Sequence, residues 1–291
     1  RDRNGAPVRV QSDVLLRVLA CEIGSGAFFT ATLSRYLMNT RKFLAHHGFT
    51  SVAMDDPRFD HDATRNSWGG PVNFLAQLRA PDAFEHHGHV AELALVAAPV
   101  LAALAAADRF PQCMDPWAGD AGYKQGYTPS ILWLLDAVER HFGVLENPDG
   151  DLWFSGATPT RLEHGSAAQS SAYGRTVDGV RWELVGDDEL VEVHRDREPA
   201  FSFPRGWRLE TDAAGVPVAV VGLGAQPVEG VLHIGADERM LRLAPNERVR
   251  LADGSAADTS VDGLLDVTWP GGQHTFPIVV KSRIGQGAVG L

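Results

Sequence analysis

The first half of the chain has the hydrophobic spacing of helices. Up to about residue 150, apolar side chains recur every three or four positions, which places them on one face of a helix. This pattern predicts helices at residues 15–19, 28–37, 72–78, 84–104 and 129–142. We expect Pro99 to kink or interrupt the fourth helix and Gly143 to end the fifth.

The second half has the pattern of strands. Apolar and polar residues alternate in short segments that are separated by turn dipeptides such as Asp178-Gly179. The alternation predicts strands at residues 180–185, 189–194, 207–210, 216–221, 230–234 and 264–269. Strands with one apolar face are typical of antiparallel sheets packed on a core. We therefore expect an α-then-β chain, with a helical domain over residues 1–155 and an antiparallel β-sandwich over residues 156–291.

Two long connections separate the predicted helices. They cover residues 51–71 and 108–128 and are rich in proline, glycine and aspartate. Connections of about 20 residues are uncommon in compact domains and usually have a function. These two segments are therefore the places to look for a site.

The first connection has the residue types of a sugar-binding site: Asp55, Asp56, Arg65, Asn66, Trp68 and Gly70. An indole ring stacks on the apolar C–H face of a pyranose, while acids and amides bond its hydroxyls. A purely structural interpretation is also open. In that case Asp55 or Asp56 caps a turn, and Trp68 belongs to the core.

The second connection repeats this mixture just before a predicted helix: Gln112, Asp115, Trp117 and Tyr127. The same stacking and hydroxyl-binding chemistry is open to these side chains. The structural alternative is an Asp-Pro turn, with Trp117 packing as a lid over the helix ends.

Charge and composition exclude several classes of partner. The chain has 26 Lys and Arg against 37 Asp and Glu, which gives a net charge of −11. Such a surface repels phosphate backbones, so we expect no nucleic acid and favour a neutral or cationic small substrate. The longest apolar run, residues 93–107, is 15 residues long and contains Pro99, so it is too short to span a membrane.

Cofactor and metal motifs are missing. The chain has no phosphate-binding or dinucleotide-binding fingerprint, so we expect no cofactor. His86 and His89 have the spacing of a shared metal, but no other ligand pattern accompanies them, and we expect no metal. Cys21 and Cys113 are predicted to be buried free thiols, with a single disulfide as the alternative. The opening residues resemble no leader, so we expect a processed, trimmed or truncated chain, cytoplasmic or secreted.

Four short motifs add a resemblance. Residues 51–59 read S-V-A-M-D-D-P-R-F, residues 68–73 W-G-G-P-V-N, residues 112–119 Q-C-M-D-P-W-A-G, and residues 127–130 Y-T-P-S. In order, they resemble S-V-A-x-D-D-P-x-F, W-x-G-P-V-W, E-x-x-(N/D)-P-x-x-G and (Y/F)-x-(P/W)-(S/T). The four patterns that they resemble occur in the C-terminal half of the catalytic domain in (α/α)6-barrel glycoside hydrolases, in the clan of family 63 and the mannosylglycerate-hydrolase-like domains. The resemblance covers about residues 1–155.

The resemblance implies half of a helical toroid. The family's barrel has twelve helices, and this chain has room for five or six. The family's general acid would therefore lie in a missing N-terminal half or in a second chain that completes the barrel. The family's base is the Glu that opens the third motif, and here that position is Gln112, whose amide cannot take a proton from water. Asp115 and the Asp55–Asp56 pair are the nearest alternatives as catalytic carboxylates.

The expected function is therefore glycoside hydrolysis by carboxylate acid and base groups, as part of a larger chain or assembly. The substrate would be an oligosaccharide or a glycoside, with side chains from both connections as its binding walls. Two alternatives stay open. Gln112 favours a non-catalytic carbohydrate-binding relative. A polysaccharide lyase would need a Tyr or His base and a cationic groove, which the net charge of −11 disfavours.

Overall fold

The computed structural model describes residues 3–7, 9–123, 126–158 and 170–251, together with three short strands after residue 255. The chain divides into two compact units. The first consists of Arg1–Ala83, Ala103–Trp133 and Asp266–His274, and the second of Phe84–Ala102, Leu134–Leu265 and Thr275–Leu291. The predicted domain boundary between residues 155 and 156 is a statement about domains that fold independently. Division into compact units does not test it, so it stays a prediction.

The first unit begins with short helices. They are α1 (Val14–Leu19), α2 (Gly26–Thr32) and the π-helical turn η1 (Leu33–Leu37). The Ser25 hydroxyl caps α2 by accepting a hydrogen bond from the Phe28 amide, as short polar side chains do at helix starts. Leu16, Phe29 and Leu33 are fully buried. The predicted helices at 15–19 and 28–37 are therefore confirmed.

Two short strand pairs also belong to this unit. β1 (Leu44–Ala45) pairs with β2 (Gly48–Phe49). β3 (Val72–Asn73) pairs with β4 (Cys113–Met114), so that Val72 lies opposite Met114. The helix predicted to begin at Val72 begins only at α3 (Phe74–Gln77), because residues 72 and 73 are held in the strand pair.

Three more helices follow: α4 (Ala80–His86), α5 (Val90–Ala106) and α6 (Thr128–Phe142). The prediction of one helix over residues 84–104, kinked or interrupted at Pro99, is wrong about the position of the break. Gly88 has a φ of +75°, a left-handed conformation that ends helices, whereas Pro99 lies inside α5 without ending it. α6 ends before Gly143, as predicted.

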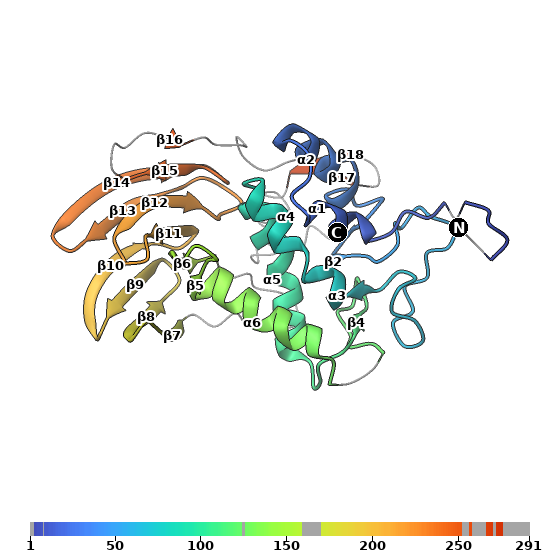
Figure 1. Ribbon diagram of the computed structural model, residues 1–291, viewed down its shortest axis with the longest axis horizontal. Coiled ribbons are helices and arrows are strands. Elements are labelled where there is room, and N and C mark those ends of the chain that lie inside the picture. The colour runs from blue at the N-terminus through green and yellow to red at the C-terminus, as the bar shows by residue number, and fades with distance from the viewer. Residues whose placement is uncertain are drawn as a thin grey trace. The chain divides into compact units, whose positions relative to one another are not determined.

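Most strands of the second unit form two six-stranded antiparallel sheets (Figure 1). One sheet has the order β14-β13-β10-β9-β8-β7, and the other β16-β15-β12-β11-β6-β5. The bounds of these strands are β5 (Val144–Glu146), β6 (Leu152–Gly156), β7 (Ser171–Val177), β8 (Val180–Gly186), β9 (Leu190–Arg195), β10 (Glu198–Pro204), β11 (Trp207–Thr211), β12 (Pro217–Gly222), β13 (Val228–Ile234), β14 (Asp237–Leu243), β15 (Arg248–Arg250) and β16 (Ala256–Ala257). A separate pair consists of β17 (Asp266–Trp269) and β18 (Gly272–Thr275).

The two large sheets share one hydrophobic core. Trp182 and Phe203 come from one sheet, and Phe154, Trp207 and Leu209 from the other, in a single cluster of buried side chains. The rings of Phe154 and Trp182 meet with their centroids 5.0 Å apart. The predicted order of helices first and antiparallel strands second is confirmed at this level.

Some of the strands that the sequence did not predict lack a clear alternating pattern, although β7 alternates regularly in burial. β10 contains two prolines, and β14 is exposed over most of its length.

The prediction of two buried free thiols is confirmed in part: Cys113 is buried and free, but Cys21, which is also free, is exposed. Burial raises the pKa of Cys113 to about 11. Among the described residues, no helix has the length and apolar character that crossing a membrane requires.

Candidate functional site

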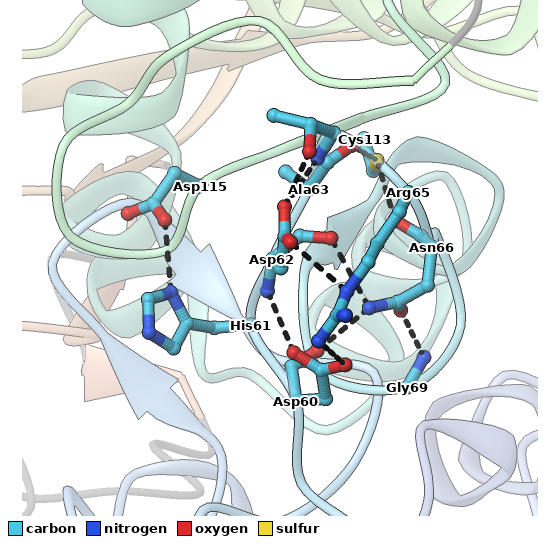
Figure 2. Close-up of polar contacts among 10 residues, drawn as sticks. Asp60, His61, Asp62, Ala63, Arg65, Asn66, Gly69, Cys113 and Asp115 are labelled. Atoms are coloured by element: carbon cyan, nitrogen blue, oxygen red, sulfur yellow. Dashed lines mark hydrogen bonds and ion pairs between the residues drawn. The ribbon is translucent and has the colours of Figure 1, made fainter.

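The two long connections are joined to each other. The β3–β4 pair holds the end of the first against the middle of the second. The Tyr123 amide donates to the Ala63 carbonyl at 2.7 Å. The Cys113 thiol lies 3.7 Å from that oxygen and 3.6 Å from the Asn66 carbonyl (Figure 2). Segments that are about 50 residues apart in sequence therefore form one structure.

Asp115 organises the tight turn of the second connection. Its Oδ1 accepts hydrogen bonds from the amides of Trp117 at 2.9 Å and Ala118 at 2.8 Å. Gly119 closes the turn with a φ of +74°, and a side chain there would come within 2.9 Å of His47 Nε2. The Asp and the Gly of the third motif therefore each have a structural reason, and the predicted Asp-Pro turn is confirmed.

His61 is a residue of this region that sequence reasoning missed. Its Nδ1 lies 3.0 Å from the second carboxylate oxygen of Asp115 (Figure 2). The His61 ring also meets the Trp117 indole edge-on, with 4.9 Å between centroids. One signal was available, since His61 is the only histidine in either connection. The chain therefore brings an acid, an imidazole and an indole together.

The hydrogen bond between His61 and Asp115 has a defined direction. Burial raises the pKa of Asp115, but hydrogen bonds from Ala118, Trp117 and His61 outweigh it and hold the pKa below its usual range. An ionised carboxylate only accepts hydrogen bonds, so Nδ1 of His61 carries the proton. In a neutral ring, the lone pair is then on Nε2, which has no hydrogen-bond partner among the described residues.

Asp55 and Asp56 are both engaged elsewhere. Asp55 forms an ion pair with Lys42. Asp56 is 7% exposed and accepts hydrogen bonds from the backbone amides of Arg58 at 2.9 Å and Gln11 at 3.3 Å. The Arg58 amide is the largest cause of a lowered pKa at Asp56. Asp56 thus stabilises a turn, as the structural alternative expected.

Three other predicted residues hold the first connection in shape. Arg65 binds the carboxylates of Asp60 at 2.8 Å and Asp62 at 2.9 Å. The Asn66 amide donates to the carbonyls of the same two residues and accepts from the Gly69 amide (Figure 2). At Gly70, an added Cβ would lie 2.6 Å from the Asp60 carbonyl oxygen. A sugar would have to compete with these bonds for Arg65 and Asn66.

The two tryptophans remain accessible. Trp68 is 40% exposed, with the Arg17 guanidinium over its ring at 5.2 Å, and Trp117 is 46% exposed. The interpretation of Trp68 as a core residue is therefore wrong. Tyr127 is half-buried, and its carbonyl accepts the amide and the hydroxyl of Ser130 in the first turn of α6.

Gln112 lies in a buried position. Its backbone carbonyl accepts a hydrogen bond from the Phe74 backbone amide, and its backbone N–H donates to the Tyr123 carbonyl, each at 3.1 Å. Its side-chain oxygen is buried and has no hydrogen-bond partner within the described part of the chain. A glutamate at this position would be desolvated, which raises a carboxyl pKa toward the range of a general base.

No metal centre accompanies these groups. Across the described ranges, no cluster of three or more His, Cys, Asp or Glu side chains could hold an ion. His89, one of the two histidines with metal spacing, is buried, with its Nδ1 3.3 Å from a Glu92 oxygen.

Comparisons with known proteins are limited to solved structures. No family model and no curated protein matches the chain. One similar structure is a family 63 mannosylglycerate hydrolase from Thermus thermophilus in complex with glucose, with 22% identity over 47% of this chain and 32% of that chain, at a TM-score of 0.37. An uncharacterized conserved protein from the same organism has 21% identity over 45% and 32%, at 0.38. A sialidase has 12% identity over 73% and 21%, at 0.51.

The likeness to the sialidase structure is a likeness of fold alone. This chain spans about a third or less of each of these three structures. What their whole chains do is therefore a matter for proposal.

Proposed function

We propose that this chain is part of a glycoside hydrolase, with its sugar site where the two long connections meet. The observation that carries the proposal is the half-exposed Trp117 indole beside the His61–Asp115 pair, at the junction that β3 and β4 create. An accessible indole next to ionisable groups suits a pyranose, which has an apolar ring face and a polar rim. The four ordered motifs support the same interpretation.

The proposed architecture is half of an (α/α)6 toroid followed by a β-sandwich. Several helices expose large apolar side chains, which supports a missing N-terminal half or a second chain that covers them: Val14 and Val18 of α1, Phe28 of α2, and Leu132 and Leu135 of α6. That partner would supply the general acid. The bound substrate would be an oligosaccharide or a glycoside.

Among the proposed catalytic positions, Asp115 and the position of Gln112 are the stronger candidates. Asp115 is ionised and lies beside both His61 and Trp117. Asp56 is weaker because backbone amides bond both of its oxygens, whereas in Asp115 they bond only Oδ1 and Oδ2 faces His61. Gln112 cannot act as a base, so this chain would need Asp115 or a group from its partner to activate water.

The first test of the proposal is binding. Calorimetric titration of the chain with methyl glycosides and short oligosaccharides should give saturable binding that Trp117→Ala weakens at least tenfold. Phe28→Ala removes another half-exposed aromatic ring from the same unit and should leave binding unchanged. No binding of any saccharide would contradict the proposal.

The second test is catalysis by Gln112→Glu. Nitrophenyl glycosides have a leaving group that departs without protonation, so they report on the base even when the general acid is absent. We expect Gln112→Glu to hydrolyse one of them faster than the original chain, because it restores a carboxylate. Gln77→Glu, which changes another buried glutamine of the same unit, is the control and should show no gain. Retained sugar binding without any gain would favour the non-catalytic relative.

A polysaccharide lyase stays a second candidate because of His61. A lyase base removes the proton beside a uronate carboxylate, the glycosidic C–O bond breaks, and a C=C bond forms as the leaving oxygen takes a proton. His61, held by Asp115 with its Nε2 lone pair unpaired, is the kind of base this step requires. Ultraviolet absorbance of an unsaturated uronate product, lost in His61→Gln, would identify it. A reaction that yields only a saturated product excludes it.

A further inference from the structure

The second compact unit contains a pocket far in sequence from the two long connections. It has a volume of about 290 Å³ and lies on the outer face of the β16-to-β5 sheet, opposite the shared core. Arg208 and Glu210 reach it from β11, because they alternate with the core residues Trp207 and Leu209. Its size is close to the lower end for small-molecule sites.

One wall of the pocket is a continuous chain of ion pairs. Arg208 donates to both oxygens of Glu85 at 2.9 Å, and also to Glu210 at 2.9 Å. Glu210 in turn accepts from Arg248 at 2.8 Å, and Arg140 binds Glu85 at 3.3 Å. The Arg208 side chain is only 5% exposed. Burying such groups brings little net stability compared with apolar packing, so stability alone does not explain this wall.

An aromatic ring completes the lining. The Arg208 guanidinium lies 4.0 Å from the centroid of the half-buried Trp153 indole, which is held in β6 next to the ion pairs. Val90 and Val218 add apolar surface, and Asn147 and Asp151 add polar groups from the β5–β6 turn. The pocket therefore combines a fixed indole with preorganised acceptors and donors.

The charges decide the class of ligand. Among the lining residues, Glu85, Glu210 and Asp151 carry three negative charges against the two guanidinium groups of Arg208 and Arg248. Arg140, which pairs with Glu85, is also paired with Asp136 and so leaves this balance unchanged. A wall with one acid in excess disfavours anions, and alternating carboxylates and guanidinium groups match hydroxyls, which donate and accept. We propose that this pocket binds one neutral sugar ring, as a carbohydrate site independent of the one proposed at the long connections.

The test uses the full chain labelled with ¹⁵N at tryptophan, with Trp153→Phe to assign the indole resonance of Trp153. Methyl α-glucoside, methyl α-mannoside and methyl β-galactoside are the neutral probes; glucuronate is the anionic one. We expect at least one neutral probe to shift the Trp153 resonance with a Kd on the order of 1 mM, and glucuronate to bind more weakly. Arg248→Gln should weaken this binding about tenfold, through loss of a charged hydrogen bond.

Matched variants make the result specific. Arg250→Gln changes an exposed arginine two residues along the same strand that does not line the pocket, and binding should be unchanged. Val218→Phe fills the pocket from an exposed position and should abolish binding. Trp117→Ala should leave the Trp153 shift intact, which separates this site from the one proposed above. No shift with any neutral probe, or equal binding by Arg248→Gln, overturns the proposal.

Discussion

Asp115 and Asp56 show how similar carboxylates come to differ at the scale of single residues. Both accept backbone amide hydrogen bonds, and both have a lowered pKa. Only Asp115 also bonds an imidazole and lies beside an accessible indole. The chemistry open to each acid therefore follows from its neighbours rather than from the Asp-Asp-Pro or Asp-Pro sequence around it.

Gly119 of the second connection should be hard to replace, because both its backbone conformation and its surroundings exclude a side chain. Gly119→Ala must adopt a left-handed φ and also push against His47, so we expect a loss of about 2–3 kcal/mol in the free energy of unfolding. Gly179→Ala has a similar φ of +82° but open space around its Cβ, and should lose only about 1 kcal/mol. Urea unfolding of both variants gives the comparison. Equal losses would show that the close approach to His47 is unimportant.

His141 should make the stability of the chain depend on pH. Burial, together with the nearby charge of Arg140, lowers the pKa of His141 to about 3. The unfolded chain then binds an extra proton below about pH 6.5, so stability falls as the pH is lowered from 6.5 toward 3. At pH 5 this loss is about 2 kcal/mol. His141→Gln should flatten the dependence in urea unfolding at pH 7 and pH 5, and an unchanged slope would contradict the assignment.

At the scale of elements, the β3–β4 pair connects the two parts of the candidate site. Four residues in register hold two connections together that the sequence only shows as separate segments. Asn73 is central to this, since its side chain caps α3 at the Leu75 amide and also donates to the Ser67 carbonyl. It occupies the position where the resembled family has a tryptophan.

The structure should therefore tolerate neither a smaller nor a larger side chain at Asn73. Asn73→Ala removes the cap and leaves the buried Ser67 carbonyl unpaired, at a cost of about 2–3 kcal/mol. Asn73→Trp introduces the residue of the resembled pattern but has no space, because Asn73 is fully buried, and should cost at least as much. Thermal unfolding with Arg79→Ala as a surface control measures both. A stabilised Asn73→Trp variant would mean that the motif packs as in the family.

At the scale of the whole molecule, the helices present apolar surface that a partner would cover. Leu132 and Leu135 of α6 are 51% and 56% exposed, whereas Trp133 between them is buried. An amphipathic helix with apolar side chains on its exposed side is typical of an interface. The missing partner proposed above would cover this surface.

Replacing both exposed leucines should change association and not folding. Leu132→Lys with Leu135→Lys should alter the free energy of unfolding by no more than about 0.5 kcal/mol, because both side chains lie at the surface. In sedimentation experiments the original chain should self-associate as its concentration rises, and the double variant should remain monomeric. Trp133→Ala is the buried control and should cost about 3–5 kcal/mol. Self-association that persists in the double variant would place the interface elsewhere.

Local pattern was a good guide to some elements and a poor one to others. The predicted strands at 180–185 and 207–210 correspond to β8 and β11, whose alternation is regular. The helix predicted at 84–104 failed because a left-handed Gly88 ends α4, while α5 tolerates a proline. His61 was missed because nothing in its neighbourhood along the chain indicates the distant Asp115 with which it pairs.

By itself, the sequence determined the order of helices and strands, the two unusually long connections and the glutamine at position 112. These are properties of local periodicity and composition, which each segment carries alone. Only the tertiary structure decided which acids are committed to turns, which indoles stay accessible, and that His61 bonds a residue 54 positions away. Such contacts depend on strand pairing and burial between distant segments, and no local pattern encodes them.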